Sequence, residues 1–397
     1  MTNLIRRIQE SLKSHKIDGW LFYSFKKNDP FAERILKFKQ LGHGTRRCFY
    51  FIPSEGDPVK IVHAIEKTAL DELEGKKLVY LSWTELEDSL KTALEGFHNI
   101  AMQYSPMNRI PYISCVDAGT VEIVKSLGKN VVSAGELIQE FESILDEEQM
   151  ESHKEACILL RKFVDEVFTN TAERLRNNIK TTEYDVQQMT CDLFKKHNMI
   201  TSSLPVAGVN ENSADPHYEP TKENSKEIRK GDFLLLDLWA KFDRPRAIYG
   251  DITWTCYFGD SIPEKYVKVF DIVSNARDSA FNFIKERLSN KKEVQGWEVD
   301  DVTRNVIKNA GYGKYFIHRT GHSIGEEVHG TGVMIDNLET KDIRPITAGC
   351  CFSIEPGIYI EGDFGIRSEI DVFINRQLEP MCFSEPIQKE VLKYGNI

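Results

Sequence analysis

The chain is organised around one stretch, His318-Arg319-Thr320-Gly321-His322-Ser323-Ile324-Gly325-Glu326-Glu327-Val328-His329. Three of the ten histidines lie within it. Acidic residues in apolar runs stand on both sides, Asp237 and Asp251 upstream and Glu355 and Glu369 downstream. An isolated carboxylate in a low-dielectric interior is costly unless it is paired or ligated. Four such acids and a histidine therefore predict a bound cation.

Length and composition set the class of protein. A chain of 397 residues is long enough for two domains, because single cores stop growing at roughly 250 to 300 residues. A hydrophobic content of 41% and a charged content of 28% are typical of a globular protein. The net charge of -10 argues against nucleic-acid and anionic-membrane partners, which repel a polyanion. We expect no membrane span and no signal peptide, since no apolar run follows the basic residues near the start.

The eight cysteines form no CxxC pair and no regular framework, and several lie in apolar runs. This pattern is typical of reduced core cysteines in a cytoplasmic protein.

The first third of the chain alternates helical and strand periodicities. A helix is expected at 2–15, and a second helix buries Leu86 and Leu90 behind an N-cap at Ser82 or Thr84. Strands are expected at 19–23, 48–52, 59–63, 78–81 and 99–103. This order predicts an α/β unit with a mainly parallel or mixed sheet. Its four scattered histidines, His15, His43, His63 and His98, suggest no shared site.

The predicted domain boundary falls before a long helix, which gives domains at 1–147 and 148–397. The helices expected in the second domain are 148–176, 182–197 with a cap at Thr181 or Thr182, 263–288 and 299–310. Its strands are expected at 233–239, 251–258, 351–355, 357–360 and 365–374.

The four acids demand a common explanation, because each would otherwise need its own buried cationic partner. The strands concerned carry no lysine near those acids, and only Arg367 is close. Oxygen ligands with one imidazole suit Mn²⁺, Fe²⁺, Co²⁺ or Zn²⁺ better than a thiolate site would. Two divalent ions about 3.5 to 4 Å apart would balance four carboxylates.

The order of these motifs resembles the pita-bread-fold metallopeptidases, which include methionyl aminopeptidase, aminopeptidase P and prolidase. The resemblance covers about 150–397, and the motifs that carry it are Asp237, Asp251-Ile-Thr-Trp-Thr, His318-x3-His322-x6-His329, Ile354-Glu355-Pro356-Gly357-Ile-Tyr and Gly365-Ile-Arg367-Ser-Glu369. The first third is more loosely similar to the creatinase/prolidase N-terminal domain. The implied fold is α+β, a C-terminal pita-bread domain behind a smaller α/β domain.

The resemblance also implies a role for each position. Asp237 would chelate one metal, Asp251 and Glu369 would bridge both, and His322 and Glu355 would complete the second. Mn²⁺ is the first expectation for the pair, with Co²⁺, Zn²⁺ or Fe²⁺ as alternatives. A hydroxide between the metals would be the nucleophile, and Glu355 would accept its proton.

Further residues would serve the substrate or support the ligands. His217, His318 and His329 fall where the family places histidines that bind substrate, stabilise the tetrahedral intermediate or shuttle its proton. Arg367, two residues before Glu369, is expected as a supporting partner for that ligating carboxylate rather than as a substrate contact.

Two features depart from the family pattern. Asp237 and Asp251 are fourteen residues apart, a few more than usual, and the extra length falls in the loop signal 242–246. Trp254 replaces an arginine that is common in the family, which puts the shape of the substrate pocket in question.

The implied activity is hydrolysis of the bond before proline, in Xaa-Pro dipeptides or at the N-terminus of short Xaa-Pro-Yaa peptides. Proline lacks an N–H and has a fixed φ, so general peptidases fail on it. The alternatives are a creatinase-like C–N hydrolase and a non-catalytic pita-bread binding protein, although both classes typically lack ligands that this chain retains. The family further implies a homodimer, with a tetramer as the alternative.

Overall fold

The protein is described here by a computed structural model that covers residues 2–38 and 44–397, so His43 lies outside the described residues. The chain divides into two compact units, Met1–Glu142 and Ser143–Ile397. The sequence prediction placed the boundary slightly later, directly before the long helix. Within the described ranges, no helix combines the length and apolar character that crossing a membrane requires.

The N-terminal unit is built on a six-stranded mixed sheet with the order β4-β3-β2-β1-β5-β6. The strands are β1 (Gly19–Ser24), β2 (Cys48–Pro53), β3 (Val59–His63), β4 (Lys76–Tyr80), β5 (Asn99–Met102) and β6 (Asn130–Ser133). The helices are α1 (Thr2–Ser14), α2 (Pro30–Leu36), α3 (Trp83–Ala93), α4 (Ala118–Ser126) and α5 (Gly135–Ile138). The sheet is mixed because β1 pairs antiparallel with β2 and parallel with β5.

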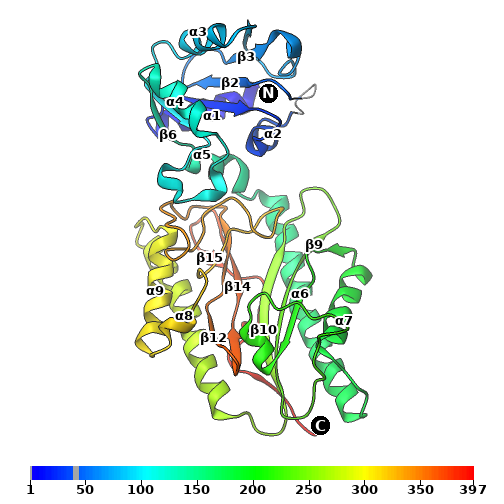
Figure 1. Cartoon of the computed structure of the whole chain (residues 1–397). Helices are drawn as coiled ribbons and strands as arrows, with labels where there is room; N and C mark the ends of the chain where they lie inside the picture. The colour runs from blue at the N-terminus through cyan, green and yellow to red at the C-terminus, as the bar shows by residue number, and fades with distance from the viewer. Residues whose placement is uncertain (1, 39–43) are drawn as a thin grey trace. The chain divides into compact units, whose positions relative to one another are not determined.

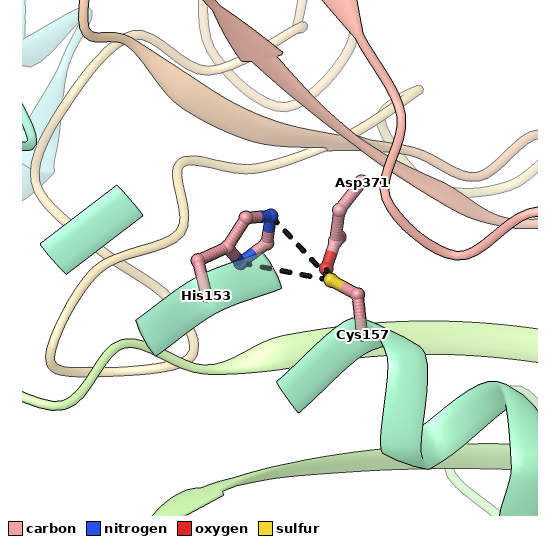
Figure 2. Close-up of side chains that lie close together, drawn as sticks. All are labelled: His153, Cys157 and Asp371. Carbon is pink, nitrogen blue, oxygen red and sulfur yellow. Dashed lines mark hydrogen bonds between the residues drawn. The ribbon is translucent and has the colours of Figure 1, made fainter. Parts of the chain in front are cut away.

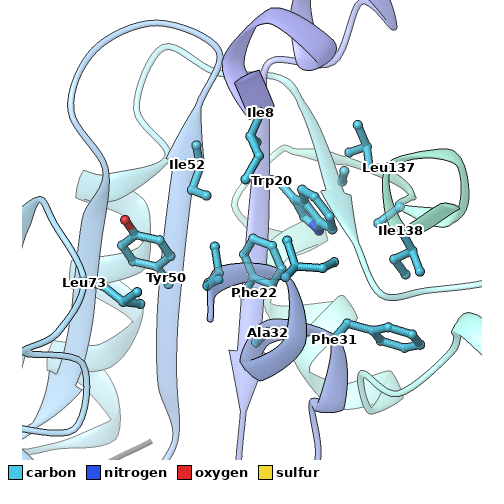
Figure 3. Packing of buried hydrophobic residues seen from close by; sticks show 14 of the residues in the cluster. Ile8, Trp20, Phe22, Phe31, Ala32, Tyr50, Ile52, Leu73, Leu137 and Ile138 are labelled. Atoms are coloured by element: carbon cyan, nitrogen blue, oxygen red, sulfur yellow. The ribbon is translucent and has the colours of Figure 1, made fainter. Parts of the chain in front are cut away.

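The continuous apolar run in β1 follows from burial on both faces of this sheet. Trp20 and Phe22 point into one core with side chains of α1, α2 and α5, and their rings stack at 4.3 Å between centroids (Figure 3). Leu21 and Tyr23 point into the opposite core, under α3 and α4. Alternate residues of a strand face opposite sides, so a strand covered on both faces must be apolar throughout.

The C-terminal unit packs helices around short sheets (Figure 1). Its helices are α6 (Glu147–Arg176), α7 (Glu183–Lys196), α8 (Glu264–Ser289) and α9 (Gly296–Asn309). Its strands are β7 (Met199–Ile200), β8 (Val206–Val209), β9 (Phe233–Phe242), β10 (Gly250–Phe258), β11 (Cys351–Ile354), β12 (Gly357–Ile360), β13 (Phe364–Arg367), β14 (Ile370–Ile374), β15 (Pro380–Met381) and β16 (Leu392–Tyr394).

Three sheets share this unit, with the orders β16-β10-β9-β7, β11-β14-β15 and β12-β13, and β8 also pairs with β9. In Figure 1, α6 and α7 lie on one side of the strands and α8 and α9 on the other. Capping residues fix the N-terminal ends of α6 and α7. Asp146 and Thr182 each form a capping box, so α6 begins at Glu147 and α7 at Glu183, each within one residue of the predicted start.

One strand prediction was wrong. The expected strand at 365–374 is two strands, β13 and β14, that pair with different partners. β13 pairs with β12, whereas β14 pairs with β11, and the chain changes sheets at Ser368 and Glu369. The change is hard to find in the sequence, because residues 365–374 are all buried and no glycine or proline marks the break at Ser368 and Glu369. The break places Glu369 at the junction between two sheets.

Candidate functional site

The hairpin of β9 and β10 provides the two aspartates. The strands pair antiparallel, with Asp237 opposite Thr253 and Asp251 opposite Trp239. Directly opposed residues share a face, and so do residues two apart in one strand. Asp237, Asp251 and Thr253 therefore project from one face of the hairpin. The longer connection between the strands adds a loop at 243–249 and leaves this register intact.

The histidine loop is held against β11 by backbone pairing. Gly321 bridges to Ile335, and Ser323 bridges to Phe352. The backbone N–H of His322 donates to Ser353 Oγ at 3.0 Å, and the N–H of Ser353 donates to His322 O at 2.8 Å. A Cβ on Gly321 would come within 1.9 Å of Ser353 O, so only glycine permits this approach. These contacts fix the direction of the His322 ring.

The two glutamates occupy breaks between strands. Glu355 follows β11 and precedes β12, while Glu369 stands between β13 and β14. Ser353 Oγ donates to Glu355 Oε1 at 3.1 Å, and Thr253 Oγ1 donates to Glu369 Oε2 at 2.7 Å. Both carboxylates are thus held by hydroxyl groups from neighbouring strands.

The structure brings all five predicted ligands into one region. His322 Nε2 lies 3.6 Å from Asp251 Oδ2 and 3.3 Å from Glu355 Oε1. Ligand atoms of Asp251, His322 and Glu369 all lie within 4.8 Å of one another. Asp237 joins them through Arg367, which also lies 4.0 Å from Glu355 Oε2. Each of these side chains is buried except that of Glu355, which is 13% exposed.

Arg367 has a different partner from the one expected. Its guanidinium pairs with Asp237 rather than with Glu369. It reaches Glu369 only through Thr253, because Arg367 Nε donates to Thr253 Oγ1 at 2.9 Å and that hydroxyl donates to Glu369. The sequence separation of two residues suggested the wrong carboxylate, since β13 turns its arginine towards the hairpin. Arg367 also donates to Tyr359 OH at 3.0 Å.

Electrostatics in this region favour the capture of positive charge. Burial and the neighbouring carboxylates hold the pKa of Asp251 and of Glu369 well above the usual range. Burial also raises the pKa of Asp237, and Arg367 opposes that rise. One guanidinium cannot compensate this many buried acids. A cation among the carboxylates would supply the missing charge.

The imidazole of His322 is prepared to act as a neutral ligand. Burial lowers its pKa to about 3, so the ring is uncharged at neutral pH. Its Nδ1 lies 3.2 Å from Ser323 O, which assigns the proton to Nδ1 and leaves the lone pair on Nε2. That nitrogen faces Asp251 and Glu355.

The absence of hydrogen-bond partners for some of the carboxylate oxygens also favours divalent cations. Asp237 Oδ1, Asp251 Oδ1 and Glu369 Oε1 are buried and have no hydrogen-bond partner. Buried polar atoms are nearly always satisfied, so three unsatisfied carboxylate oxygens in one region need an explanation. Oxygen ligands with one neutral imidazole form the donor set of Mn²⁺, Fe²⁺, Co²⁺ or Zn²⁺.

The three remaining histidines differ in exposure. His318 is half-buried, and its Nε2 lies 2.8 Å from Tyr359 OH. Burial lowers its pKa to about 4. His329 is exposed, and its ring stands edge-on to that of His322 at 4.3 Å between centroids. His217 is also exposed, and its charge is among those that lower the pKa of His329. His318 thus lies beside Tyr359 and His329 beside His322, while His217 lies within electrostatic reach of His329.

Sequence reasoning overlooked several polar residues that support the site. Thr253 and Ser353 each hold a glutamate, and Tyr359 joins His318 to Arg367. Alternation could have found Thr253, since it lies two residues from Asp251 on the same face. Asp371 was also missed; its Oδ2 accepts from the backbone N–H of Asp251 at 2.7 Å.

Trp254 lies away from the carboxylates. It occupies the opposite face of β10 from Asp251 and Thr253, is 4% exposed, and belongs to the core beneath α6. The guanidinium of Arg161 on α6 stacks over its ring at 3.7 Å from the centroid. The departure from the family pattern thus changes the packing of the hairpin on α6 rather than the face that carries the acids.

Comparisons with known proteins agree with this geometry. A model of metallopeptidase family M24 matches residues 151–376. A putative dipeptidase of Bacillus subtilis is 30% identical over 298 residues, which cover 74% of this chain and 73% of the relative. A Xaa-Pro dipeptidase of Lactobacillus delbrueckii is 32% identical over 198 residues, 50% of this chain and 49% of the relative. The crystal structure of a prolidase from Thermococcus sibiricus superposes with a TM-score of 0.61 at 23% identity, over 98% of both chains.

Proposed function

This chain belongs to metallopeptidase family M24, and we propose that it hydrolyses the bond before proline, with two divalent cations held by Asp237, Asp251, His322, Glu355 and Glu369. The observation that carries the proposal is the set of unsatisfied, buried carboxylate oxygens that face a neutral imidazole. Mn²⁺ is the first candidate, and Co²⁺, Zn²⁺ and Fe²⁺ share the same ligand preference.

Bound cations would lower the pKa of water and polarise the scissile carbonyl. Side chains of the protein would then accept the proton and orient the ligands. Glu355 accepts a proton from the attacking water, and Ser353 fixes its orientation by donating to Oε1. Thr253 orients Glu369, and Arg367 orients Asp237, so the ligating carboxylates keep their geometry while substrate enters and leaves.

The three remaining histidines would contact the substrate. Both ring nitrogens of His318 are engaged, Nδ1 with Arg319 O at 2.7 Å and Nε2 with Tyr359 OH at 2.8 Å, so it would line the substrate site as a fixed ring and would not itself donate to the carbonyl. His329, exposed beside His322, would bind the peptide, and the exposed His217 would bind it or return a proton to the leaving proline nitrogen. Burial lowers the pKa of His318 and of His329 to about 4, so both rings would meet the peptide uncharged at pH 7.

Substrate length is the finer question. One relative is named a Xaa-Pro dipeptidase and another a putative dipeptidase, which supports action on dipeptides in this chain too. Action at the N-terminus of longer Xaa-Pro-Yaa peptides is the alternative. We also propose a homodimer in a reducing compartment, the cytoplasm; the eight cysteines, all free and six of them buried, support the compartment.

The test is metal reconstitution. Protein stripped by a chelator should be inactive on a Xaa-Pro dipeptide and should recover with Mn²⁺ or Co²⁺. Comparing Xaa-Pro, Xaa-Pro-Yaa and Xaa-Ala then separates dipeptidase, aminopeptidase and general peptidase activity. Absence of turnover with any of the four divalent metals would refute the peptidase proposal.

A matched pair of variants locates the ligands. Asp237→Asn should lose metal and activity, because the amide cannot supply the charge that the cation needs. Asp243→Asn changes an exposed acid in the loop that follows β9, and should behave like the native protein. Equal metal content in both variants would remove Asp237 from the ligand set.

A further inference from the structure

A buried acid on α9 is bonded to the histidine loop, although none of the sequence motifs includes it. The side chain of Asp300 is fully buried. Its Oδ1 accepts two hydrogen bonds from Thr320, one from the backbone N–H at 3.0 Å and one from Oγ1 at 2.6 Å. Its Oδ2 accepts from the backbone N–H of Asn337 at 2.9 Å and from Arg304 Nε at 2.6 Å. Both oxygens are therefore held, and half of their bonds come from a single residue of the histidine loop.

Thr320 extends this restraint to the proposed proton acceptor. It stands midway between His318 and His322, and it is fully buried. Its carbonyl oxygen accepts from the backbone N–H of Glu355 at 2.7 Å. Asp300 and Glu355 thus bond to the same residue. A displacement of Thr320 would therefore disturb the backbone of the histidine loop and that of Glu355 together.

Arg304 restrains the start of the histidine loop. It lies one turn after Asp300 on α9 and pairs with it. Its Nη1 donates to Phe316 O at 3.2 Å, its Nη2 donates to His318 O, and its guanidinium lies 4.2 Å from the centre of the Phe316 ring. The planar fork of an arginine can bond several oxygens at once, so the ion pair on α9 holds the main chain at 316, 318 and 320.

These restraints matter because the surrounding chain has little regular structure. Within the described residues, no helix or strand is assigned from Phe316 to Cys350. The backbone groups of such a segment need partners outside regular secondary structure. A buried carboxylate is costly, and an apolar side chain could fill the same place on α9. Apart from Arg304, every donor to Asp300 lies in this segment, which indicates that the acid serves the histidine loop rather than the helix.

The β9–β10 hairpin has a comparable anchor. Asp371 on β14 is fully buried, and its Oδ2 accepts from the backbone N–H of Asp251 at 2.7 Å. The thiol of Cys157 lies 3.6 Å from the same oxygen, and His153 lies one turn earlier on α6 (Figure 2). The hairpin and the histidine loop are thus each restrained by a buried carboxylate that accepts a main-chain N–H.

We propose that Asp300, paired with Arg304, is a positioning residue for the proposed hydrolysis. It acts through Thr320, and it fixes where the His318 ring and the Glu355 backbone stand relative to the ligating carboxylates. The inference rests on the proposed function for its effect on turnover. The restraint on Glu355 can also be measured without turnover, so the two proposals can fail separately.

A pair of threonine variants separates positioning from packing. Thr320→Val keeps the shape of the side chain and removes its hydrogen bond to Asp300, whereas Thr320→Ser keeps the bond and removes a buried methyl group. In saturating Mn²⁺, kcat on a Xaa-Pro dipeptide should fall by about 10-fold or more in Thr320→Val and stay within about threefold of native in Thr320→Ser. A packing role predicts the reverse order. That order, or equal losses in the two variants, would overturn the proposal.

Thr303→Val is the matched control. Thr303 is also fully buried on α9, but its hydroxyl donates to Val299 O of the same helix at 2.9 Å. This variant should keep the native kcat, and a Thr320→Val variant as active as it would contradict the proposal. Asp300→Ala should lose turnover by about 100-fold or more. If Asp300→Ala fails to fold, the threonine variants decide.

Amide hydrogen exchange tests the restraint in the metal-free protein. The Glu355 amide should exchange at least about 10-fold faster in Thr320→Val than in Thr320→Ser or Thr303→Val, because its acceptor is Thr320 O. Equal exchange rates in the three variants would overturn the proposal. Faster exchange in Thr320→Val, together with no turnover by the native protein under any of the four metals, would refute the peptidase proposal alone.

Discussion

Replacing Gly321 with alanine should disable the site without touching a proposed ligand. The new Cβ would lie 1.9 Å from Ser353 O, whereas an ordinary contact needs about 3.4 Å. The histidine loop and β11 must therefore separate by about 1.5 Å. Both hydrogen bonds between His322 and Ser353 lie at this point, so the imidazole moves with the loop.

The size of the effect follows from that displacement. His322 Nε2 is 3.3 Å from Glu355 Oε1 and 3.6 Å from Asp251 Oδ2, so a shift of this size removes the ring from the other ligands. Misplacement by about 1 Å can reduce activity by about 100-fold, and we expect kcat/KM on a Xaa-Pro dipeptide to fall by at least this factor. Overpacking should also lower the free energy of unfolding by about 1 to 3 kcal/mol.

The control lies in the same loop. A Cβ on Gly325 would meet only Glu327 O, at 3.9 Å, so Gly325→Ala should match the native protein. Dipeptide turnover in saturating Mn²⁺ and urea unfolding of the metal-free protein measure the two effects separately. If Gly321→Ala turns over substrate and unfolds like Gly325→Ala, the close approach of the loop to β11 does not position His322.

Three further predictions follow from single side chains. His322→Ala should lose metal and activity together, whereas His329→Ala, at an exposed position, should keep its metal by elemental analysis and lose turnover. Arg367→Met should lower the free energy of unfolding in urea by about 3 to 5 kcal/mol, because Asp237 loses its buried partner. Burial raises the pKa of Asp29 in the N-terminal unit from 3.8 to about 7, so folding holds a proton that the unfolded chain releases, and stability should fall by roughly 4 kcal/mol at most as pH rises from 4 to 7. Asp29→Asn should reduce this slope in urea unfolding measured across the same pH range, and leave the part that comes from the other buried acids, Asp237, Asp251 and Glu369.

Each of these has a clear contrary result. Equal metal loss in His322→Ala and His329→Ala would refute the assignment of His322 as a metal ligand and of His329 as a group that acts only on the substrate. An Arg367→Met variant as stable as the native protein would mean that Asp237 is compensated elsewhere. An unchanged pH slope in Asp29→Asn would show that another group carries the proton.

The proposed ligands could be chosen from the sequence because their signal is local. Asp237 and Asp251 each interrupt a buried strand, and a charge there has few explanations. The strand β1 and the caps of α3 and α7 at Ser82 and Thr182 were predictable for the same reason, since each depends on neighbours within a few positions. The M24 match agrees with the resemblance that those acids suggested.

Other features depend on how distant segments meet. The partner of Arg367 was mistaken because proximity in sequence favoured Glu369, while the turn of β13 directs the guanidinium to Asp237. Asp371, His153 and Cys157 were overlooked because each is unremarkable alone. Only the packing of α6 beside β14 brings them together. Alternation within one strand cannot reveal a contact between a helix and a strand that are far apart in the chain.

The pairing of Asp237 with Arg367 has a consequence for biosynthesis, because the two residues are 130 positions apart. Chains are synthesised at about 5 to 20 residues per second, so Asp237 emerges roughly ten seconds before its partner. Throughout that interval the acids of the β9–β10 hairpin lack both Arg367 and Glu369. If the site takes divalent cations as proposed, its full set of ligands becomes available to them only after Glu369 has been made.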